Sequence, residues 1–206
     1  ADAIRYHLCY NNKKFYRKRE KMMTELELRE TQLSSKEIFD GRILHVFEDT
    51  VRLPNGAAAS REYLRHIGAV CVIPVLEDGS VLVERQYRYP VAQVLTEIPA
   101  GKLDAKDEDH LLAAQRELRE ETGATAERWT SLGLFYPACA YSDEAIEMYL
   151  AQGLHFGERH LDADEFLNVA RVPLTELVGE VMAGRIPDAK TQIAILKADR
   201  LLNGAQ

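Results

Sequence analysis

Cysteine is scarce in this sequence, and no hydrophobic run is long enough to cross a membrane. Cys9, Cys71 and Cys139 are odd in number and widely spaced, so the sequence predicts neither a disulfide framework nor a CxxC zinc site. The most apolar stretch, residues 69–76, is far shorter than a membrane span and contains Pro74. We therefore expect a soluble protein of the reducing cytoplasm, without a membrane partner.

Positive charge is also in short supply, since 26 Lys and Arg stand against 33 Asp and Glu and give a net charge of −7. This balance argues against a general nucleic-acid-binding surface. Residues 1–22 are the exception, because their seven basic and two acidic residues give them a charge of +5 and leave −12 for the remainder. This atypical basic extension is a tail for an acidic partner, a helix packed on the domain, or sequence upstream of a true start at Met22 or Met23. The third interpretation is favoured, because the recognisable motifs begin directly after it.

Residues 23–66 are expected to form an N-terminal sheet region, with strands joined by tight turns from Glu25 to His66. The segment 43–53 alternates loosely between apolar and polar residues, Asn55-Gly56 is a strong hairpin signal, and residues 58–65 form the returning strand. A sheet of so few strands is marginal alone. We therefore predict a small antiparallel sheet that packs on its own domain or on a partner subunit.

Residues 67–206 are expected to form the main domain, with strands and helices of the α/β class. The first predicted strand is continuously apolar, as expected of a strand buried on both faces. The pattern predicts a mixed sheet between helices, an α/β/α sandwich. The expected strands are 68–76, 81–87, 94–98, 130–136, 146–151 and 166–173, and the expected helices are 108–122, 175–183 and 189–202.

Three glutamates share one face of the predicted helix 108–122. Glu117, Glu120 and Glu121 stand at i, i+3 and i+4, where like charges repel by about 0.2–0.5 kcal/mol per pair. A hard divalent cation such as Mg²⁺ would turn that repulsion into binding. The alternative is an ordinary solvated face, in which Arg116 pairs with Glu120 at i, i+4.

The surrounding residues favour the metal site. Gly101 opens the segment, Glu108 follows, and RELREETGA occupies residues 116–124 after seven intervening positions. This stretch resembles the Nudix box, which reads Gly, five residues, Glu, seven residues, then Arg-Glu-aliphatic-x-Glu-Glu-x-Gly-aliphatic. Gly101 stands one residue too far from Glu108, so the loop carries an insertion or Asp107 takes the loop-acid role. Ala124 is also smaller than the usual final aliphatic residue.

The likeness extends well beyond the box, over roughly residues 30–200. It is closest to the ADP-ribose and related nucleoside diphosphate sugar pyrophosphatases of the Nudix hydrolase family. The resemblance implies a Nudix-type α/β/α sandwich and a homodimer whose N-terminal sheet is exchanged or shared between subunits. The segments that carry it are SSKEIFDGRI (34–43), VERQYRYPV (83–91), EIPAGKLD (97–104), YPACAYSDEAIEMYLA (136–151) and DAKT (188–191).

The resemblance also implies the metal ligands. Glu117, Glu120 and Glu121 would hold two or three Mg²⁺ ions, with the backbone carbonyl of Ala100 as a further ligand and Mn²⁺ as a possible substitute. Arg116 would orient the carboxylates of the helix rather than contact the substrate.

Other residues are expected to act on the substrate. By the same resemblance Glu144 is the candidate catalytic base, with its neighbour Asp143 as the nearest rival, in a loop that closes over bound substrate. Arginine recognises phosphate through its planar fork, so the candidate substrate-binding residues are Arg61 and Arg88, with Gln86 and Glu97 nearby.

The expected activity is Mg²⁺-dependent hydrolysis of ADP-ribose to AMP and ribose 5-phosphate. The alternatives are another nucleoside diphosphate sugar such as GDP-mannose or ADP-glucose, an oxidised nucleotide, or a non-catalytic sensing module. The intact glutamate triplet favours the enzyme, because a sensor needs to recognise phosphate but has no use for a hydrolytic metal cluster. The residues alone do not decide the base or the sugar, since a few side chains on loops set specificity.

Overall fold

The computed structural model describes residues 23–161 and 166–204, which fall into two compact units. The first unit consists of the described residues up to Lys36 together with Glu48–Arg61, and the second holds Glu37–Phe47 and the chain from Glu62 onward. The interpretations offered for residues 1–22 lie outside the described part of the chain.

The N-terminal region forms a three-stranded antiparallel sheet in the order β1-β2-β3, as predicted. Its strands are β1 (Thr31–Asp40), β2 (His45–Arg52) and β3 (Ala58–Arg65). The predicted hairpin turn is confirmed, because the Gly56 N–H donates to the Leu53 carbonyl at 2.9 Å and Gly56 has a φ of 87°.

The prediction of strand from Glu25 onward was wrong at its start. Residues Glu25–Leu28 form a short helix, α1. The reason is a capping box, in which the Thr24 side chain accepts from the Glu27 N–H while the Glu27 carboxylate accepts from the Thr24 N–H.

The second unit is built on a mixed sheet whose main strands run in the order β10-β5-β4-β9-β8. The pair β4–β9 is parallel, whereas β4–β5, β5–β10 and β8–β9 are antiparallel, and β6 and β7 extend the sheet from β5 and β4. The strands are β4 (Ala69–Val75), β5 (Ser80–Arg88), β6 (Gln93–Glu97), β7 (Ala100–Lys102), β8 (Ala124–Phe135), β9 (Ile146–Phe156) and β10 (Leu167–Pro173).

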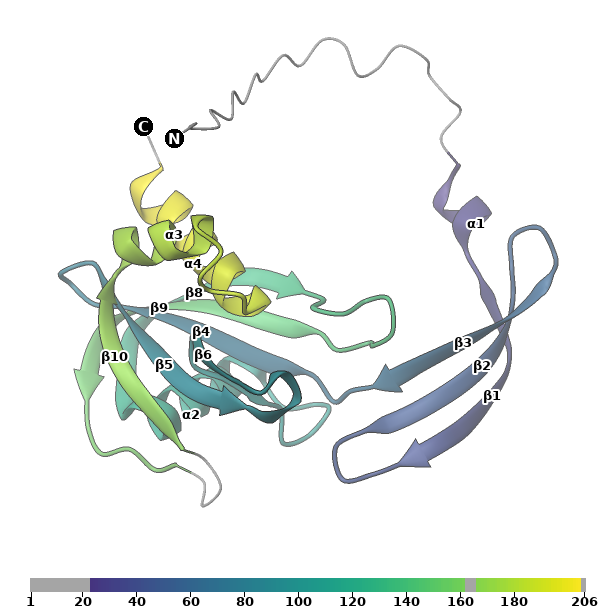
Figure 1. Ribbon diagram of the computed structural model, residues 1–206, viewed down its shortest axis with the longest axis horizontal. Helices are drawn as coiled ribbons and strands as arrows, with labels where there is room; N and C mark the ends of the chain where they lie inside the picture. The colour runs from purple at the N-terminus through teal and green to yellow at the C-terminus, as the bar shows by residue number, and fades with distance from the viewer. Residues whose placement is uncertain (1–22, 162–165, 205–206) are drawn as a thin grey trace, which may run out of the picture. The chain divides into compact units, whose positions relative to one another are not determined.

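Helices cover both faces of this sheet, which confirms the α/β/α sandwich (Figure 1). Every residue of β4 is buried, and its alternation sends Cys71, Ile73 and Val75 into one core and Val70 and Val72 into the other. The first core contains residues of α3 (Leu174–Met182) and α4 (Ala189–Asn203), and the second contains residues of α2 (His110–Thr122).

Three of the differences from the expectation have a local reason. The helix starts at His110 rather than at 108, because Asp109 is its N-cap. Strand β8 starts at Ala124, six positions before the predicted Thr130, directly after the left-handed cap at Gly123. Residues Ala100–Lys102, expected as loop, form β7 because they pair with the buried strand β4.

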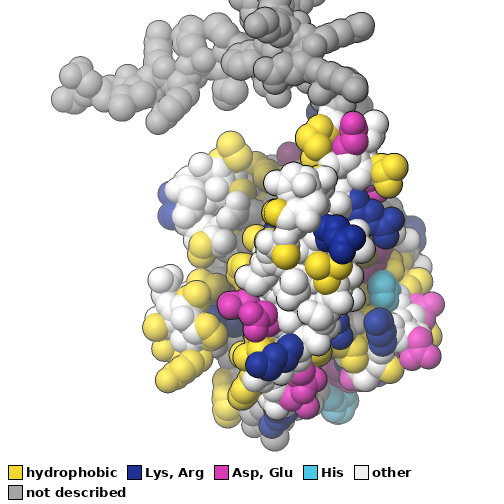
Figure 2. Space-filling model, turned by 90° about the vertical axis from the view of Figure 1, so that its right-hand side faces the viewer, with side chains coloured by type: hydrophobic (Ala, Val, Ile, Leu, Met, Phe, Trp, Pro, Cys, Tyr) yellow, Lys and Arg dark blue, Asp and Glu magenta, His cyan; other side chains and the backbone are white. Residues whose placement is uncertain are grey.

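Cys71 and Cys139 are both free thiols. Cys71 lies in the core, where burial raises the pKa of its thiol to about 12, so it has no thiolate chemistry near neutral pH. Large hydrophobic side chains remain at the surface of both units, including Leu33 and Phe39 on β1, and the space-filling view shows hydrophobic groups interspersed with charged ones (Figure 2). Among the described residues no helix is long and apolar enough to cross a membrane.

Candidate active site

Helix α2 presents its acids from a fixed position. The Asp109 carboxylate accepts from the N–H groups of Leu111 at 2.9 Å and Leu112 at 3.0 Å, which fixes the start of the helix. Gly123 ends it in the left-handed conformation, with a φ of 72°. The buried face of α2, which includes Leu118, packs into the core and leaves the acidic face at its edge.

Arg116 lies at the centre of the acidic face. Its guanidinium is 2.7 Å from Glu117, 3.4 Å from both Glu120 and Glu108, and 3.5 Å from Asp104. Burial alone would lower the pKa of Arg116, but the charge of Glu117 and the other acids outweighs it and raises that pKa. These five residues are called the Arg116 cluster.

Glu108, one of the two candidates for the loop-acid position, contacts the cluster from the loop that precedes α2. Its carboxylate accepts from the Asp104 N–H at 2.6 Å and contacts Arg116. The extra residue between Gly101 and Glu108 is therefore accommodated inside the loop.

The backbone of β7 lies directly against the glutamates of α2. A Cβ atom on Gly101 would stand 2.0 Å from Cδ of Glu117, so only glycine leaves room for that carboxylate. The Ala100 N–H donates to the Glu121 carboxylate at 2.9 Å. This hydrogen bond and the close approach of Glu117 to Gly101 place the acidic face beside the Ala100–Gly101 peptide.

The donor set fits a hard divalent cation by its chemistry. Glu117, Glu120 and Glu121 offer carboxylate oxygens and Ala100 a carbonyl oxygen, the ligand types that Mg²⁺ prefers. Within the described ranges no three Asp, Glu, His or Cys side chains already stand together as a metal site. Glu117 and Glu120 contact Arg116 instead, so binding of a cation requires their carboxylates to turn from Arg116 toward the ion.

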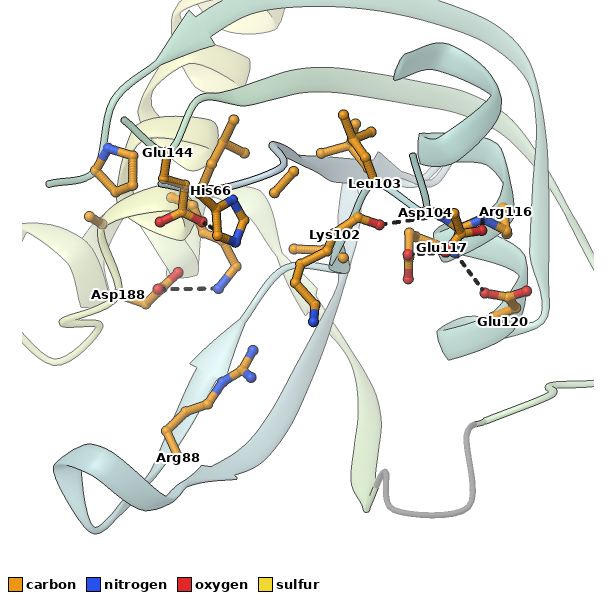
Figure 3. Close-up of a pocket in the computed structure, with 18 of the residues that line it drawn as sticks. His66, Arg88, Lys102, Leu103, Asp104, Arg116, Glu117, Glu120, Glu144 and Asp188 are labelled. Carbon is orange, nitrogen blue, oxygen red and sulfur yellow. Dashed lines mark hydrogen bonds and ion pairs between the residues drawn. The ribbon is translucent and has the colours of Figure 1, made fainter. Parts of the chain in front are cut away.

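A cavity of about 760 Å³ opens beside the Arg116 cluster, a volume that suits a small organic ligand. Glu117 and Glu120 line one part of it, and Figure 3 shows Glu144 and His66 on the opposite side. Its remaining charged or ionisable lining residues are Arg88, Lys102, Asp104, Arg116, His160, Asp188 and Lys190.

Two cations of the cavity are held by one buried carboxylate. Glu97, whose side chain is only 4% exposed, accepts from Arg88 at 2.7 and 2.9 Å and from Lys190. Burial alone would raise the pKa of Glu97, but hydrogen bonds from Arg88 and Lys190 outweigh it and keep that pKa below its ordinary value. Glu97, expected near the substrate, thus lies behind Arg88 and Lys190 and supports them.

Lys190 is fixed from a second direction by α4. Asp188 caps this helix by accepting from the Thr191 N–H at 2.9 Å, and it lies 3.2 Å from Lys190. The Thr191 hydroxyl accepts from the Ile98 N–H at 3.0 Å, which joins the start of α4 to the end of β6.

Two of the predicted substrate-binding residues have other surroundings. Arg61, on β3 of the first unit, donates from Nε to Glu30 at 2.9 Å. Gln86 lies on the same face of β5 as Arg88, two residues away, and pairs in register with Leu95 of β6.

Sequence reasoning missed several cavity residues, among them Lys190, Asp188 and His66, and the first two carried a signal. Lys190 and Asp188 belong to the DAKT segment that contributed to the family resemblance. His66 directly follows the predicted strand 58–65, and a lone histidine there gives no sign of its contacts.

Comparison with known protein families gives two adjacent matches. Residues 65–193 match the model of the NUDIX domain, and residues 30–64 match the nucleoside diphosphate sugar hydrolase N-terminal domain. Similar proteins include an ADP-ribose pyrophosphatase of Bacillus subtilis, which is 39% identical over 82% of this chain and 91% of its own length.

Two further relatives are similar over most of their lengths. A methanol dehydrogenase activator of Bacillus methanolicus is 40% identical over 81% of this chain and 90% of its own, and an ADP-ribose pyrophosphatase of Mycobacterium tuberculosis is 34% identical over 84% of each chain. A crystal structure of an ADP compounds hydrolase shares the fold, with a TM-score of 0.77 at 24% identity over 85% of this chain and 95% of that one.

Proposed function

Because this chain belongs to the Nudix hydrolase family, whose members generally use divalent metals, we propose that it hydrolyses ADP-ribose to AMP and ribose 5-phosphate with Mg²⁺. The observation that carries the proposal is a single cavity lined by the Glu117 and Glu120 carboxylates and by the cations Arg88 and Lys190. Such a lining suits a diphosphate that must bind both a metal ion and protein cations. Two relatives named ADP-ribose pyrophosphatase favour this substrate.

The residues divide the work of the reaction. Glu117, Glu120 and Glu121, with the Ala100 carbonyl, would hold the metal. When bound, Mg²⁺ neutralises charge on the diphosphate and polarises its phosphoryl oxygens. Arg116 keeps the helix carboxylates aligned.

The substrate is bound and attacked from the other walls of the cavity. Arg88 and Lys190 donate to its phosphate oxygens, and Gln86 extends the Arg88 face. The Glu144 carboxylate accepts a proton from the attacking water as the water oxygen bonds to phosphorus and the bridging P–O bond breaks. The phosphate leaving group departs with the electrons of that bond.

The N-terminal sheet, residues 23–66, is proposed to form a homodimer, with residues 67–206 as the catalytic domain. All ten residues of β1 are exposed, among them Leu33 and Phe39 on one face of the strand, and an apolar edge of this kind is suited to burial against a second copy. We expect sedimentation velocity to give a dimer, and Leu33→Glu with Phe39→Glu to give a monomer. Arg61 would then act on substrate from this sheet.

Free thiols at Cys71 and Cys139 agree with a cytoplasmic protein.

A panel of ADP-ribose, ADP-glucose and GDP-mannose, assayed with Mg²⁺, tests the activity. ADP-ribose should give the highest kcat/KM, and chelation of the metal should abolish turnover. A higher kcat/KM for GDP-mannose or ADP-glucose would change the assigned substrate. If none of the three compounds is hydrolysed, the proposal that the protein is a pyrophosphatase is wrong.

Two variants test the assigned roles. Glu120→Gln should lower kcat at least roughly 100-fold, and Glu144→Gln roughly 10²–10⁴-fold as expected for loss of a general base. The matched control is Glu127→Gln, at an exposed position of strand β8, which should retain wild-type turnover. A near-wild-type Glu144→Gln would show that Glu144 is not the base.

A further inference from the structure

The loop that carries Glu144 is joined to the chain segment that enters β4. An isolated parallel bridge pairs Leu64 with Ser142, and hydrogen bonds lie on both sides of Glu144. This attachment holds residues 141–145 to the segment that leads into β4, with Glu144 at the wall of the cavity. The four bonds are Leu64 N–H to the Tyr141 carbonyl (2.8 Å), Asp143 N–H to the Leu64 carbonyl (3.1 Å), His66 N–H to the Asp143 carboxylate (2.7 Å) and Ala69 N–H to the Ala145 carbonyl (3.0 Å).

Asp143, the other candidate for the catalytic base, is held in place by two of these hydrogen bonds. Its carboxylate accepts from the His66 backbone, while its own N–H donates to Leu64. The Glu144 N–H donates to the Ser142 hydroxyl at 3.1 Å, which orients the backbone of the base.

The imidazole of His66 has a defined tautomer. The Gly68 N–H donates to His66 Nδ1 at 3.1 Å, and a backbone N–H can only donate. Nδ1 must therefore be the acceptor, so the neutral ring carries its proton on Nε2. Nε2 lies 3.9 Å from Oε1 of Glu144, and the two side chains are 18% and 29% exposed.

At 3.9 Å the two groups attract each other electrostatically but are not yet directly hydrogen-bonded. A side-chain rotation that moves Oε1 of Glu144 by about 1 Å toward Nε2 would form a direct hydrogen bond. One bridging water would also connect the two groups. Both groups line the cavity, so substrate that fills it displaces solvent from around the pair and strengthens the interaction.

We propose that His66 is a positioning residue for the catalytic base: its Nε2–H donates to Oε1 of Glu144 and thereby aims Oε2 at the attacking water. The proposal rests on the function proposed above. The water proton passes to Oε2 of Glu144, and no proton passes through the imidazole. A neutral donor suits this role, because it restrains the carboxylate with less loss of basicity than a permanent cation would cause.

Two substitutions at His66 separate positioning from support of the loop. His66→Asn places an amide oxygen near the position of Nδ1, so it keeps an acceptor for Gly68 and loses the donor to Glu144. His66→Gln places an amide nitrogen near the position of Nε2, so it keeps the donor and loses the acceptor. Positioning predicts that Asn lowers kcat roughly 10–100-fold with KM nearly unchanged, whereas Gln recovers most of kcat. A purely structural role predicts the opposite order, with Gln the worse variant, and would overturn the proposal.

A double-mutant cycle shows whether His66 acts through Glu144. In the Glu144→Gln background, His66→Asn should reduce kcat no further. If the kcat losses of the two substitutions multiply, or if His66→Asn changes only KM, His66 contacts the substrate instead. Either result would overturn the proposal.

The matched control is His155→Asn, because His155 forms a His–Glu pair of 2.9 Å with Glu127 on an exposed surface. This variant should retain wild-type kcat. If the wild-type protein does not hydrolyse ADP-ribose, the proposed function fails. If wild type is active, Glu144→Gln is impaired and His66→Asn is not, only the role of His66 fails.

Discussion

At the scale of single residues, Gly101 and Glu117 illustrate how closely backbone and carboxylate meet in the cavity. The carboxylate of Glu117 occupies the space that any Cβ on residue 101 would need, and it contacts Arg116 at the same time. The glycine that opens the Nudix box therefore has a steric reason in this chain. Any larger residue must displace one of the proposed metal ligands.

Gly101→Ala should lower the activity and raise the Mg²⁺ concentration needed for half-maximal rate. We expect a loss of at least about tenfold in kcat/KM, because the Glu117 carboxylate, at the far end of a flexible side chain, must move away from residue 101. The control is Gly179→Ala in α3, where an added Cβ meets nothing within 4 Å and should stabilise the helix by about 0.5–1 kcal/mol. Unchanged metal dependence in Gly101→Ala would show that Glu117 does not need this space.

Glu97→Gln should destabilise the protein in a pH-dependent way. The substitution leaves Arg88 and Lys190 without their shared carboxylate, at a cost of about 1–3 kcal/mol. The pKa of Glu97 is lowered on folding, so the ionised group stabilises the native state above its ordinary value of 4.5 and loses this effect as the pH falls through the lower folded pKa. Urea unfolding should therefore show a wild-type advantage that is constant near neutral pH and shrinks below pH 4.5.

The control for Glu97 is an exposed pair of the same kind. Glu180 accepts from Arg185 at 2.5 and 2.6 Å on the surface, and Glu180→Gln should lower the melting temperature far less than Glu97→Gln. Equal effects of the two substitutions would contradict the importance of burial at Glu97.

Residue by residue, the sequence is most informative where chemistry and local spacing coincide. Helical spacing predicts that Arg116 reaches Glu120, and the structure confirms this contact. His66 could not be predicted as a partner of Glu144, because 78 positions separate the two residues and only the tertiary fold brings them together. Glu97 was expected beside the substrate, but it lies buried against Arg88 and Lys190. No local sequence pattern indicates this burial.

At the scale of elements, α2 shows which boundaries sequence can predict. The helix was expected to end at residue 122, and it does, with Gly123 as a left-handed cap at a φ of 72°. The start shifted by two residues, because a helix can begin after any of several neighbouring acids and only Asp109 accepts the first free N–H groups. Strand β7 escaped notice because three residues are too few to show a period.

Asp109→Ala should loosen the helix that presents the carboxylates. Loss of an N-cap costs about 0.5–2 kcal/mol, which corresponds to roughly 2–4 °C in Tm per kcal/mol for a chain of this size. Calorimetry should detect this decrease. Asp109→Asn, which keeps a side-chain acceptor, should lie close to wild type, and an equal loss in both variants would contradict the capping role.

At the scale of the whole molecule, the order of elements predicted the sandwich, whereas its internal connections depended on the three-dimensional fold. The pattern of strands and helices in residues 67–206 gave the two-sided sheet correctly. The parallel pairing of β4 with β9 aligns Ala69 with Ile146, two residues after Glu144. This register brings Glu144 to the cavity, and no local pattern encodes it, because it depends on strands far apart in the chain.

The most direct test of the whole account is hydrolysis of ADP-ribose with Mg²⁺ in heavy-oxygen water, followed by mass spectrometry of the products. Attack of water on the diphosphate predicts AMP and ribose 5-phosphate in equal amounts, with one heavy oxygen in one of the two phosphomonoesters. Unchanged ADP-ribose, or products without the label, would contradict the account.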